Sequence, residues 1–136
     1  MDLEQLVGQA WEALYGEGAP MAGCALSEAD AVAEVRQRYP GKPYCLVREW
    51  ALIDLECPAA VLSEIERSGR RPSVIFAHCI VLDSARRGPP GNWVRSTFEV
   101  SRDERAGFFE SRNTVYVLLG PGSRRTAPLG LVLSIH

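Results

Sequence analysis

Three Arg-Arg pairs are the residues of this sequence best suited to binding chemistry. They are Arg70 and Arg71, Arg86 and Arg87, and Arg124 and Arg125, each next to an expected strand in a turn-rich segment. Guanidinium groups bind phosphates bidentately, so three converging loops would give a basic rim with salt-sensitive affinity for nucleic acid. The simpler interpretation is that these loops are solvated. Fourteen of the fifteen basic residues in this chain are arginine, so the presence of arginine in a loop is weak evidence for phosphate binding.

Acidic residues are segregated from the basic ones. The first 35 residues hold seven acids and no base, and the other 101 hold fifteen bases and ten acids, which hides charges of −7 and +5 behind a net charge of −2. Such segregation favours a partner that is bound through complementary charge. The candidate docking residues for a protein partner are the acids on the solvent faces of two expected N-terminal helices: Asp2, Glu4, Glu12, Glu28, Asp30 and Glu34.

An expected hairpin closed at residues 101–106 supplies a further polar group. Pairing residues whose numbers sum to 207 places Phe98 opposite Phe109 on an apolar face and Arg95 opposite Arg112 on a polar one. The polar face could receive an acidic partner or an anionic ligand, and its residues are Arg95, Thr97, Glu99, Glu110 and Arg112. Cross-strand ion pairs on a solvated face are the plainer explanation.

Cysteine and histidine offer little for catalysis. The cysteine spacing lacks the C-x-x-C pair typical of zinc sites, so we expect no metal and no other cofactor. Adjacent strand residues point to opposite faces, which places His78 and Cys79 poorly for a dyad. A cysteine-dependent enzyme is therefore a remote alternative, and no residue is assigned a catalytic role. It would require Cys24, Cys45 or Cys57 to meet His78 in space, since His136 is the last residue of the sequence and Cys79 should point away from His78.

The elements that must position these residues follow from periodicity and turn signals. Residues 2–15 and 27–39 carry apolar side chains three and four apart, which predicts amphipathic helices, and Ser27 can cap the second. A short helix should start at Pro58 and end at Gly69. Strands are expected over 44–56, 73–83, 92–100, 107–119 and 128–135, with 73–83 central because it is apolar on both faces.

Two local signals refine this pattern. Arg48 and Glu49 interrupt the first strand on both faces, which favours a position near a sheet edge, since buried charges are costly unless paired. The segment Gly120-Pro121-Gly122-Ser123 is typical of a tight hairpin turn.

Together these elements predict an α+β fold in which N-terminal helices pack on a mainly antiparallel sheet of about five strands. At 136 residues we expect one domain over 1–136, with an acidic helical segment over 1–41 and a β-rich segment over 42–136. No apolar run is long enough to span a membrane, and the acidic N-terminus lacks a secretory signal, so we expect a cytoplasmic protein. A homodimer through a helix or strand edge is possible.

Two stretches, Tyr39-Pro-Gly-Lys-Pro-Tyr-Cys-Leu-Val-Arg-Glu-Trp50 and Asn113-Thr-Val-Tyr-Val-Leu-Leu-Gly-Pro-Gly122, resemble a small uncharacterised bacterial family found on mobile elements and prophages. The resemblance brings no activity, cofactor or functional residue. It implies only an accessory protein that acts on host or phage machinery by binding. Our leading hypothesis is thus a non-enzymatic cytosolic protein that binds another protein, with nucleic-acid binding and cysteine-dependent catalysis as alternatives.

Overall fold

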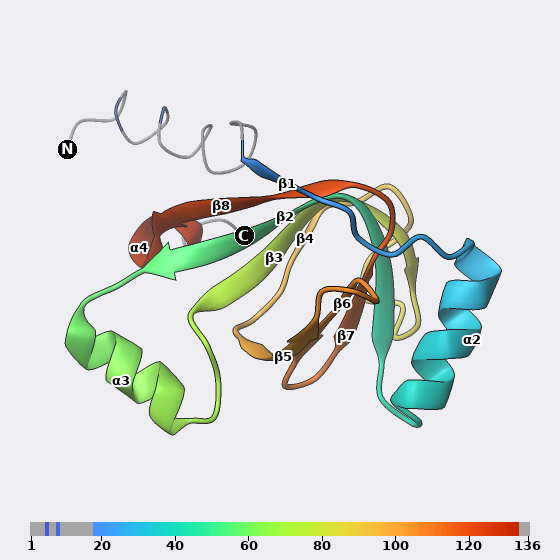
Figure 1. The fold of residues 1–136 in the computed structure, drawn as a ribbon, viewed down its shortest axis with the longest axis horizontal. Helices are drawn as coiled ribbons and strands as arrows, with labels where there is room; N and C mark the ends of the chain where they lie inside the picture. The colour runs from blue at the N-terminus through green and yellow to red at the C-terminus, as the bar shows by residue number, and fades with distance from the viewer. Residues whose placement is uncertain (1–4, 6–7, 9–17, 134–136) are drawn as a thin grey trace.

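The computed structural model describes residues 18–133 together with Gln5 and Gly8, and its centre is a strongly bent sheet of eight strands (Figure 1). The helix expected over 2–15 lies outside the described residues, except that Gln5 and Gly8 are helical. The strands are β1 Ala19–Met21, β2 Tyr44–Glu56, β3 Ser73–Asp83, β4 Val94–Arg95, β5 Glu99–Asp103, β6 Phe108–Ser111, β7 Val115–Leu118 and β8 Gly122–Pro128, and the helices are α2 Glu28–Arg38, α3 Ala59–Arg67 and α4 Leu129–Leu133.

The sheet is organised around β2. One edge of β2 pairs antiparallel with β3, and the other edge pairs in parallel first with β7 and then with β8. The change of partner falls at Arg48 and Glu49, where β2 bends sharply (Figure 1) and Glu49 adopts a φ of +54°. Both side chains are exposed. These two charges therefore mark a bend in a central strand, and the expected edge position is wrong.

The bent sheet curls until it nearly closes. The chain after β3 returns along it through β4, and a backbone bridge between Arg71 and Glu99 joins the start of β5 to the segment before β3. β5 then pairs with β6, β6 with β7, and β7 with β2. Burial of apolar side chains in this curl stabilises the fold. One buried cluster comprises Cys45, Val47, Trp50, Leu52, Ile75, Ala77, Ile80, Phe109, Tyr116 and Leu118.

Helix α2 covers one outer part of the sheet. It begins after Ser27, whose Oγ accepts a hydrogen bond from the backbone N–H of Asp30 at 3.2 Å, as the sequence predicted. Its buried residues Ala31 and Val35 pack in a cluster with side chains of β2, β6 and β7. The capping residue and the apolar spacing thus fix both the start of this helix and its inward face.

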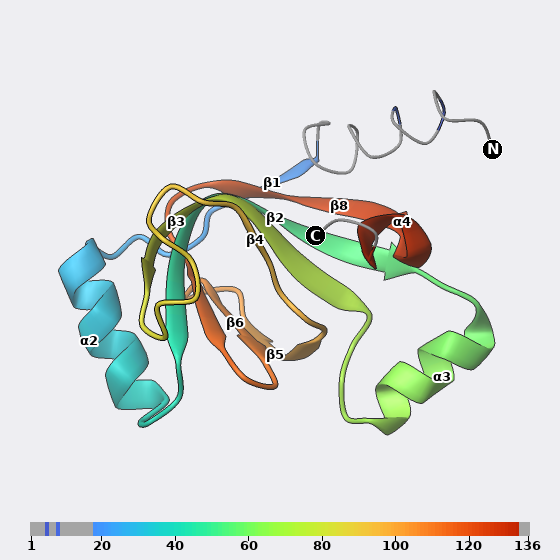
Figure 2. The same ribbon diagram turned by 180° about the vertical axis from the view of Figure 1, so that it is seen from behind.

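The other two helices lie away from α2. Leu131 and Val132 of α4 are buried in a second outer cluster with residues of β2, β3 and β8. Helix α3 links β2 to β3 and lies at the opposite end of the molecule from α2 in both views (Figures 1 and 2). Pro58 immediately precedes α3, and Gly69 follows it with a φ of +79°, a conformation that favours glycine.

Several predictions for the C-terminal half are wrong. Residues 107–119 form two strands, β6 and β7, separated by residues 112–114. The Gly120–Ser123 segment is no hairpin turn, because β7 and β8 both run parallel to β2. Glycine is needed there for close packing, since a Cβ on Gly122 would lie 2.4 Å from the Trp50 ring. Over its described part, the strand expected at 128–135 is helix α4.

The predicted hairpin closed near residues 101–106 exists as β5 and β6, but its register differs. Ser101 pairs with Glu110 and Asp103 with Phe108, so partner numbers sum to 211. Arg95 pairs with Phe76 of β3 and does not face Arg112. The register shifts between Glu99 and Ser101, an irregularity that counting from a turn cannot anticipate.

The α+β content and the elements over 27–39, 44–56, 73–83 and after Pro58 are confirmed. The expected arrangement is corrected in two respects. The sheet has eight strands, and the described helices are distributed along the chain instead of gathered at its N-terminus. Within the described residues, no helix combines the length and hydrophobicity required to cross a bilayer.

Candidate functional site

A cleft opens where the curled sheet does not close. The pairing of β5 with β6 stops at Glu99 and Ser111, and a space of about 480 Å³ lies between residues 92–97 and the β6–β7 turn. Its volume falls in the range of roughly 300–1,000 Å³ typical of binding sites. Its polar lining includes Asn92, Arg95, Thr97, Asn113 and Thr114, and its apolar lining includes Cys45, Ile80 and Trp93. We call this space the cleft.

Asp83 and Arg87 form the most extensively bonded polar unit of the cleft. Arg87 donates to both carboxylate oxygens of Asp83, from Nη2 at 3.0 Å and from Nε at 3.2 Å. Its Nη1 donates to Thr114 Oγ1 at 2.7 Å, so the unit ties the end of β3 to the β6–β7 turn. Burial raises the pKa of Asp83, but hydrogen bonds from Arg87 and from the Ala85 amide outweigh it and lower the pKa overall. Asp83 therefore remains ionised at neutral pH.

Arg95 is a second arginine in the cleft lining, and two more arginines adjoin lining residues in the sequence. Arg95 lines the cleft and donates from Nη1 to the backbone oxygen of Ser96 at 3.2 Å. Arg86 and Arg112 lie next to lining residues in the sequence, and both are exposed. Neither forms an ion pair with any residue that the structure describes. The cleft thus carries an excess of cationic groups.

Trp93 supplies an exposed aromatic surface at the cleft. It retains 45% of its accessible surface and stacks on Phe76, with ring centroids 5.7 Å apart. Tryptophan and arginine are the side chains that most often anchor protein interfaces. Cationic, amide, hydroxyl and aromatic groups therefore converge on one concave surface, an arrangement suited to holding a ligand or a protein segment.

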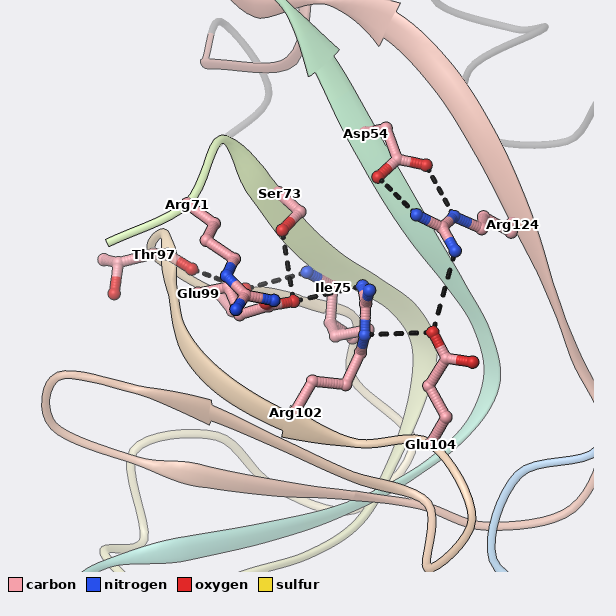
Figure 3. Close-up of polar contacts among 10 residues, drawn as sticks. Asp54, Arg71, Ser73, Ile75, Thr97, Glu99, Arg102, Glu104 and Arg124 are labelled. Carbon is pink, nitrogen blue, oxygen red and sulfur yellow. Dashed lines mark hydrogen bonds and ion pairs between the residues drawn. The ribbon is translucent and has the colours of Figure 1, made fainter. Parts of the chain in front are cut away.

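We call the line along which the curled sheet comes together the seam; the cleft is its open part. Where the Arg71–Glu99 bridge closes the seam, a carboxylate lies among arginines (Figure 3). The Glu99 side chain is fully buried, and one of its oxygens accepts a hydrogen bond from Ser73 Oγ at 3.2 Å. That oxygen lies 3.1 Å from Arg102 Nη1, and the other lies 3.5 Å from Arg71 Nη1. The ion pairs and the Arg71–Glu99 backbone bridge act at the same point, so Glu99 holds β5 to the segment before β3.

Two more carboxylates complete this group. Arg124 binds Asp54 through two hydrogen bonds of 2.7 and 3.1 Å (Figure 3). Glu104 lies 3.2 Å from Arg102 and 3.6 Å from Arg124. Three arginines are therefore matched by three carboxylates. We call Asp54, Arg71, Ser73, Glu99, Arg102, Glu104 and Arg124 the Glu99 cluster.

Two of the three Arg-Arg pairs meet, and the third lies apart from them. Arg71 and Arg124 belong to the Glu99 cluster, and Arg124 and Arg125 lie within β8, not in a loop. The guanidinium of Arg70 lies over the Phe98 ring at 5.3 Å. Arg86 and Arg87 follow the opposite end of β3, whose eleven residues span roughly 30 Å at a rise of ~3.3 Å per residue. The structure thus forms no continuous rim from these pairs.

The acidic candidates are split between described and undescribed residues. Asp2, Glu4 and Glu12 lie outside the described residues. On α2, Glu28 lies 3.6 Å from Arg48, Asp30 is exposed and Glu34 is half-buried. The last turn of α2 is basic, and its Arg38 binds Asp103 at 2.8 Å. Acids at the start and bases at the end of α2 match the helix dipole, so this distribution has a local structural cause.

Cysteine chemistry gains little support from the geometry. Cys24 and Cys45 are buried, and Cys57 and Cys79 are half-buried. Burial raises the pKa of the Cys45 thiol to about 12, so this thiol stays protonated at neutral pH and is a poor nucleophile. His78 packs edge-on against Phe76, with centroids 5.0 Å apart. Over the described part of the chain, no three His, Cys, Asp or Glu residues are grouped to hold a metal ion.

A family model described as a domain of unknown function, DUF6957, matches residues 21–134. The chain belongs to the DUF6957 family. The DUF6957 match includes every residue of both the cleft and the Glu99 cluster, and it confirms the expectation of an uncharacterised family. No curated protein and no solved structure matches this chain.

Sequence reasoning found some cleft residues of this DUF6957 chain and missed others. Arg87 and Arg95 are among the candidate anion-binding residues, and so are Arg86 and Arg112, which adjoin lining residues in the sequence. Asp83, Asn113 and Thr114 are not, because nothing in their spacing brings the end of β3 to the β6–β7 turn. The Asp83-x-x-x-Arg87 spacing was the one available signal, and it implies a local ion pair, not a cleft.

Proposed function

We propose that this protein is a non-enzymatic cytoplasmic accessory protein that acts by binding another protein, and that the cleft is its binding site. The observation that carries the proposal is the open seam of the sheet, where Trp93 is exposed beside arginine, asparagine and threonine side chains. Such a surface offers an aromatic anchor surrounded by directional polar groups. The resemblance to proteins of mobile elements extends the proposal to a partner from host or phage machinery.

The cleft is preferred to the acidic surface of α2 as the binding site. Glu28 already has a cationic neighbour in Arg48, and the far end of α2 is basic. The cleft is also preferred to a nucleic-acid surface built from the Arg-Arg pairs. Arg71 and Arg124 are matched by carboxylates, which reduces the positive potential available to phosphates.

The test is affinity capture from a lysate of the source cells by the full chain, with mass spectrometry of the bound proteins. A Thr97→Trp variant should fill the cleft, and Thr126→Trp places the same side chain at an exposed position of β8. We expect one partner to be retained by the wild type and by Thr126→Trp, and its yield to fall about tenfold with Thr97→Trp. Circular dichroism confirms that both variants fold.

Two results would count against the proposal. Equal retention by Thr97→Trp and Thr126→Trp would show that the partner binds elsewhere on the molecule. The absence of any protein that distinguishes the two variants would contradict binding at the cleft altogether.

A further inference from the structure

We infer that the partner fills the cleft with an acidic peptide segment. This inference rests on the proposed function and names the chemistry of its ligand. The starting point is the charge of the cleft lining, which holds two guanidinium groups, Arg87 and Arg95, and one carboxylate, Asp83. Arg86 and Arg112 add two exposed positive charges in the adjoining segments.

The single carboxylate does not neutralise this surface for an incoming ligand. The Asp83 side chain is only 4% exposed, and its two oxygens accept hydrogen bonds from Arg87 and from the Ala85 amide. Its charge therefore compensates that of Arg87 within the protein. The positive charges of Arg86 and Arg112 have no such compensation among the described residues, and they attract a negative ligand.

In the Glu99 cluster, arginines of this protein already bind carboxylates. There Arg124 binds the Asp54 carboxylate through two parallel hydrogen bonds, and Arg102 lies between two glutamates. Guanidinium–carboxylate pairs of this kind are short, directional and stronger than neutral hydrogen bonds. A partner that supplied carboxylates to the cleft would repeat at the open part of the seam the pairing that holds the closed part.

The remaining lining favours a peptide over a free anion or a nucleic acid. Asn92, Asn113 and Thr97 are exposed and present both donors and acceptors, which a peptide backbone requires. Trp93 offers an aromatic surface to an apolar side chain beside the carboxylates. A nucleic acid would need an extended track of phosphate contacts, but Arg71 and Arg124 of the other two Arg-Arg pairs are already matched by carboxylates.

The experiment selects binders to the immobilised full chain from a displayed library of random ten-residue peptides. Three proteins are compared: the wild type, an Arg86→Gln/Arg112→Gln variant, and a control, Arg36→Gln/Arg105→Gln. The control removes the same charge from two exposed arginines that also form no ion pair within the described residues. Selected peptides are then synthesised and titrated by the change in Trp93 fluorescence, with Trp93→Phe identifying that signal.

We expect the selected peptides to be enriched in Asp and Glu. Their affinity should fall about tenfold in Arg86→Gln/Arg112→Gln and by less than about threefold in the control, because charge pairing at close range exceeds the effect of net charge. Affinity should also fall as salt rises from about 0.05 M to about 0.5 M.

Enrichment of basic or neutral peptides would overturn the acidic ligand while leaving protein binding at the cleft in place. The same holds if no peptide is selected but lysate capture still depends on Thr97, since the partner would then present a folded surface. Displacement of a selected peptide by a DNA or RNA oligonucleotide would overturn the inference in favour of nucleic acid. Failure of both the selection and the Thr97-dependent capture would overturn the proposed function as well.

Discussion

The Glu99 cluster and the cleft are two parts of one seam, and they differ in whether their arginines are paired with carboxylates. In the Glu99 cluster, Arg71, Arg102 and Arg124 are matched by three carboxylates, and the sheet is closed by a backbone bridge at Glu99. At the cleft the strands separate, and Arg86 and Arg112 stay exposed without a carboxylate among the described residues. Arginine therefore helps to close the fold in one place, and in the other it stays exposed beside the proposed binding site.

The difference shows that an arginine's neighbours, and not its abundance, decide its role. Removing one member of a buried carboxylate–arginine pair destabilises the protein, because it leaves an uncompensated charge. An exposed arginine contributes little to stability and is available to a partner. Substitutions in the two regions should therefore separate into effects on folding and effects on binding.

The largest effect is expected in the Glu99 cluster. Glu99→Ala removes a fully buried carboxylate and leaves Arg102, whose side chain is 14% exposed, without its buried partner. We expect the free energy of unfolding to fall by about 3–5 kcal/mol. Urea denaturation measures it, with Glu56→Ala at an exposed position as the control, which should change stability by less than about 0.5 kcal/mol. A loss for Glu99→Ala as small as that of the control would contradict a closing role for this carboxylate.

An intermediate, pH-dependent effect is expected at Asp83, inside the cleft. The pKa of Asp83 is lower in the folded protein than in the unfolded chain, so its ionised form stabilises the fold above the ordinary carboxyl pKa. That contribution is lost as the pH falls through the lowered pKa. Asp83→Asn should therefore cost about 2 kcal/mol at neutral pH and progressively less below about pH 4. Denaturation curves across this range measure the gap, and a gap independent of pH would contradict the ionic origin of the stabilisation.

The smallest effect on stability is expected for Arg86→Gln/Arg112→Gln. Both side chains are exposed, so the free energy of unfolding should change by less than about 0.5 kcal/mol even though peptide affinity falls. Thermal denaturation beside the peptide titration checks this. A loss of stability comparable to that of Asp83→Asn would mean that these arginines serve the fold, and the distinction between the two regions would fail.

The sequence correctly predicted those helices and strands that are determined by their own residues or by residues next to them. Ser27 and the spacing of Val32, Val35 and Tyr39 predict α2, and Pro58 and Gly69 bound α3. The apolar runs of β2 and β3 are long enough to identify strands without knowledge of their partners. In each case the residues that decide the structure lie within or next to the element itself.

Elements that depend on distant partners could not be predicted in this way. β8 reads Gly-Ser-Arg-Arg-Thr-Ala-Pro and has no apolar alternation, yet it is a strand because β2 and β1 pair with its two edges. The glycine at 122 serves the Trp50 ring, 72 residues earlier, and not a turn. A helix, α4, takes the place of the strand expected over 128–135 in its described part, and its Leu131 and Val132 pack against the outside of the sheet.

The residue types of the candidate site could be predicted from the sequence, but their grouping in space could not. Arg86, Arg87, Arg95 and Arg112 were candidates from their type alone. Their grouping depends on the turn at 112–114 and on the register of β5 with β6, both of which differ from the sequence expectation. Glu99 was expected on a solvated face, and that same register change places it in the interior.

The pairing of β2 with two successive parallel partners has a consequence for synthesis of the protein. One edge of β2 can be paired once β3 has been made, but the other needs β7 and β8, and β8 begins only at Gly122. A nascent chain therefore carries β2 with an open edge while the segment between β2 and β8 is synthesised. Native pairing of that edge can be completed only after β8 has been made.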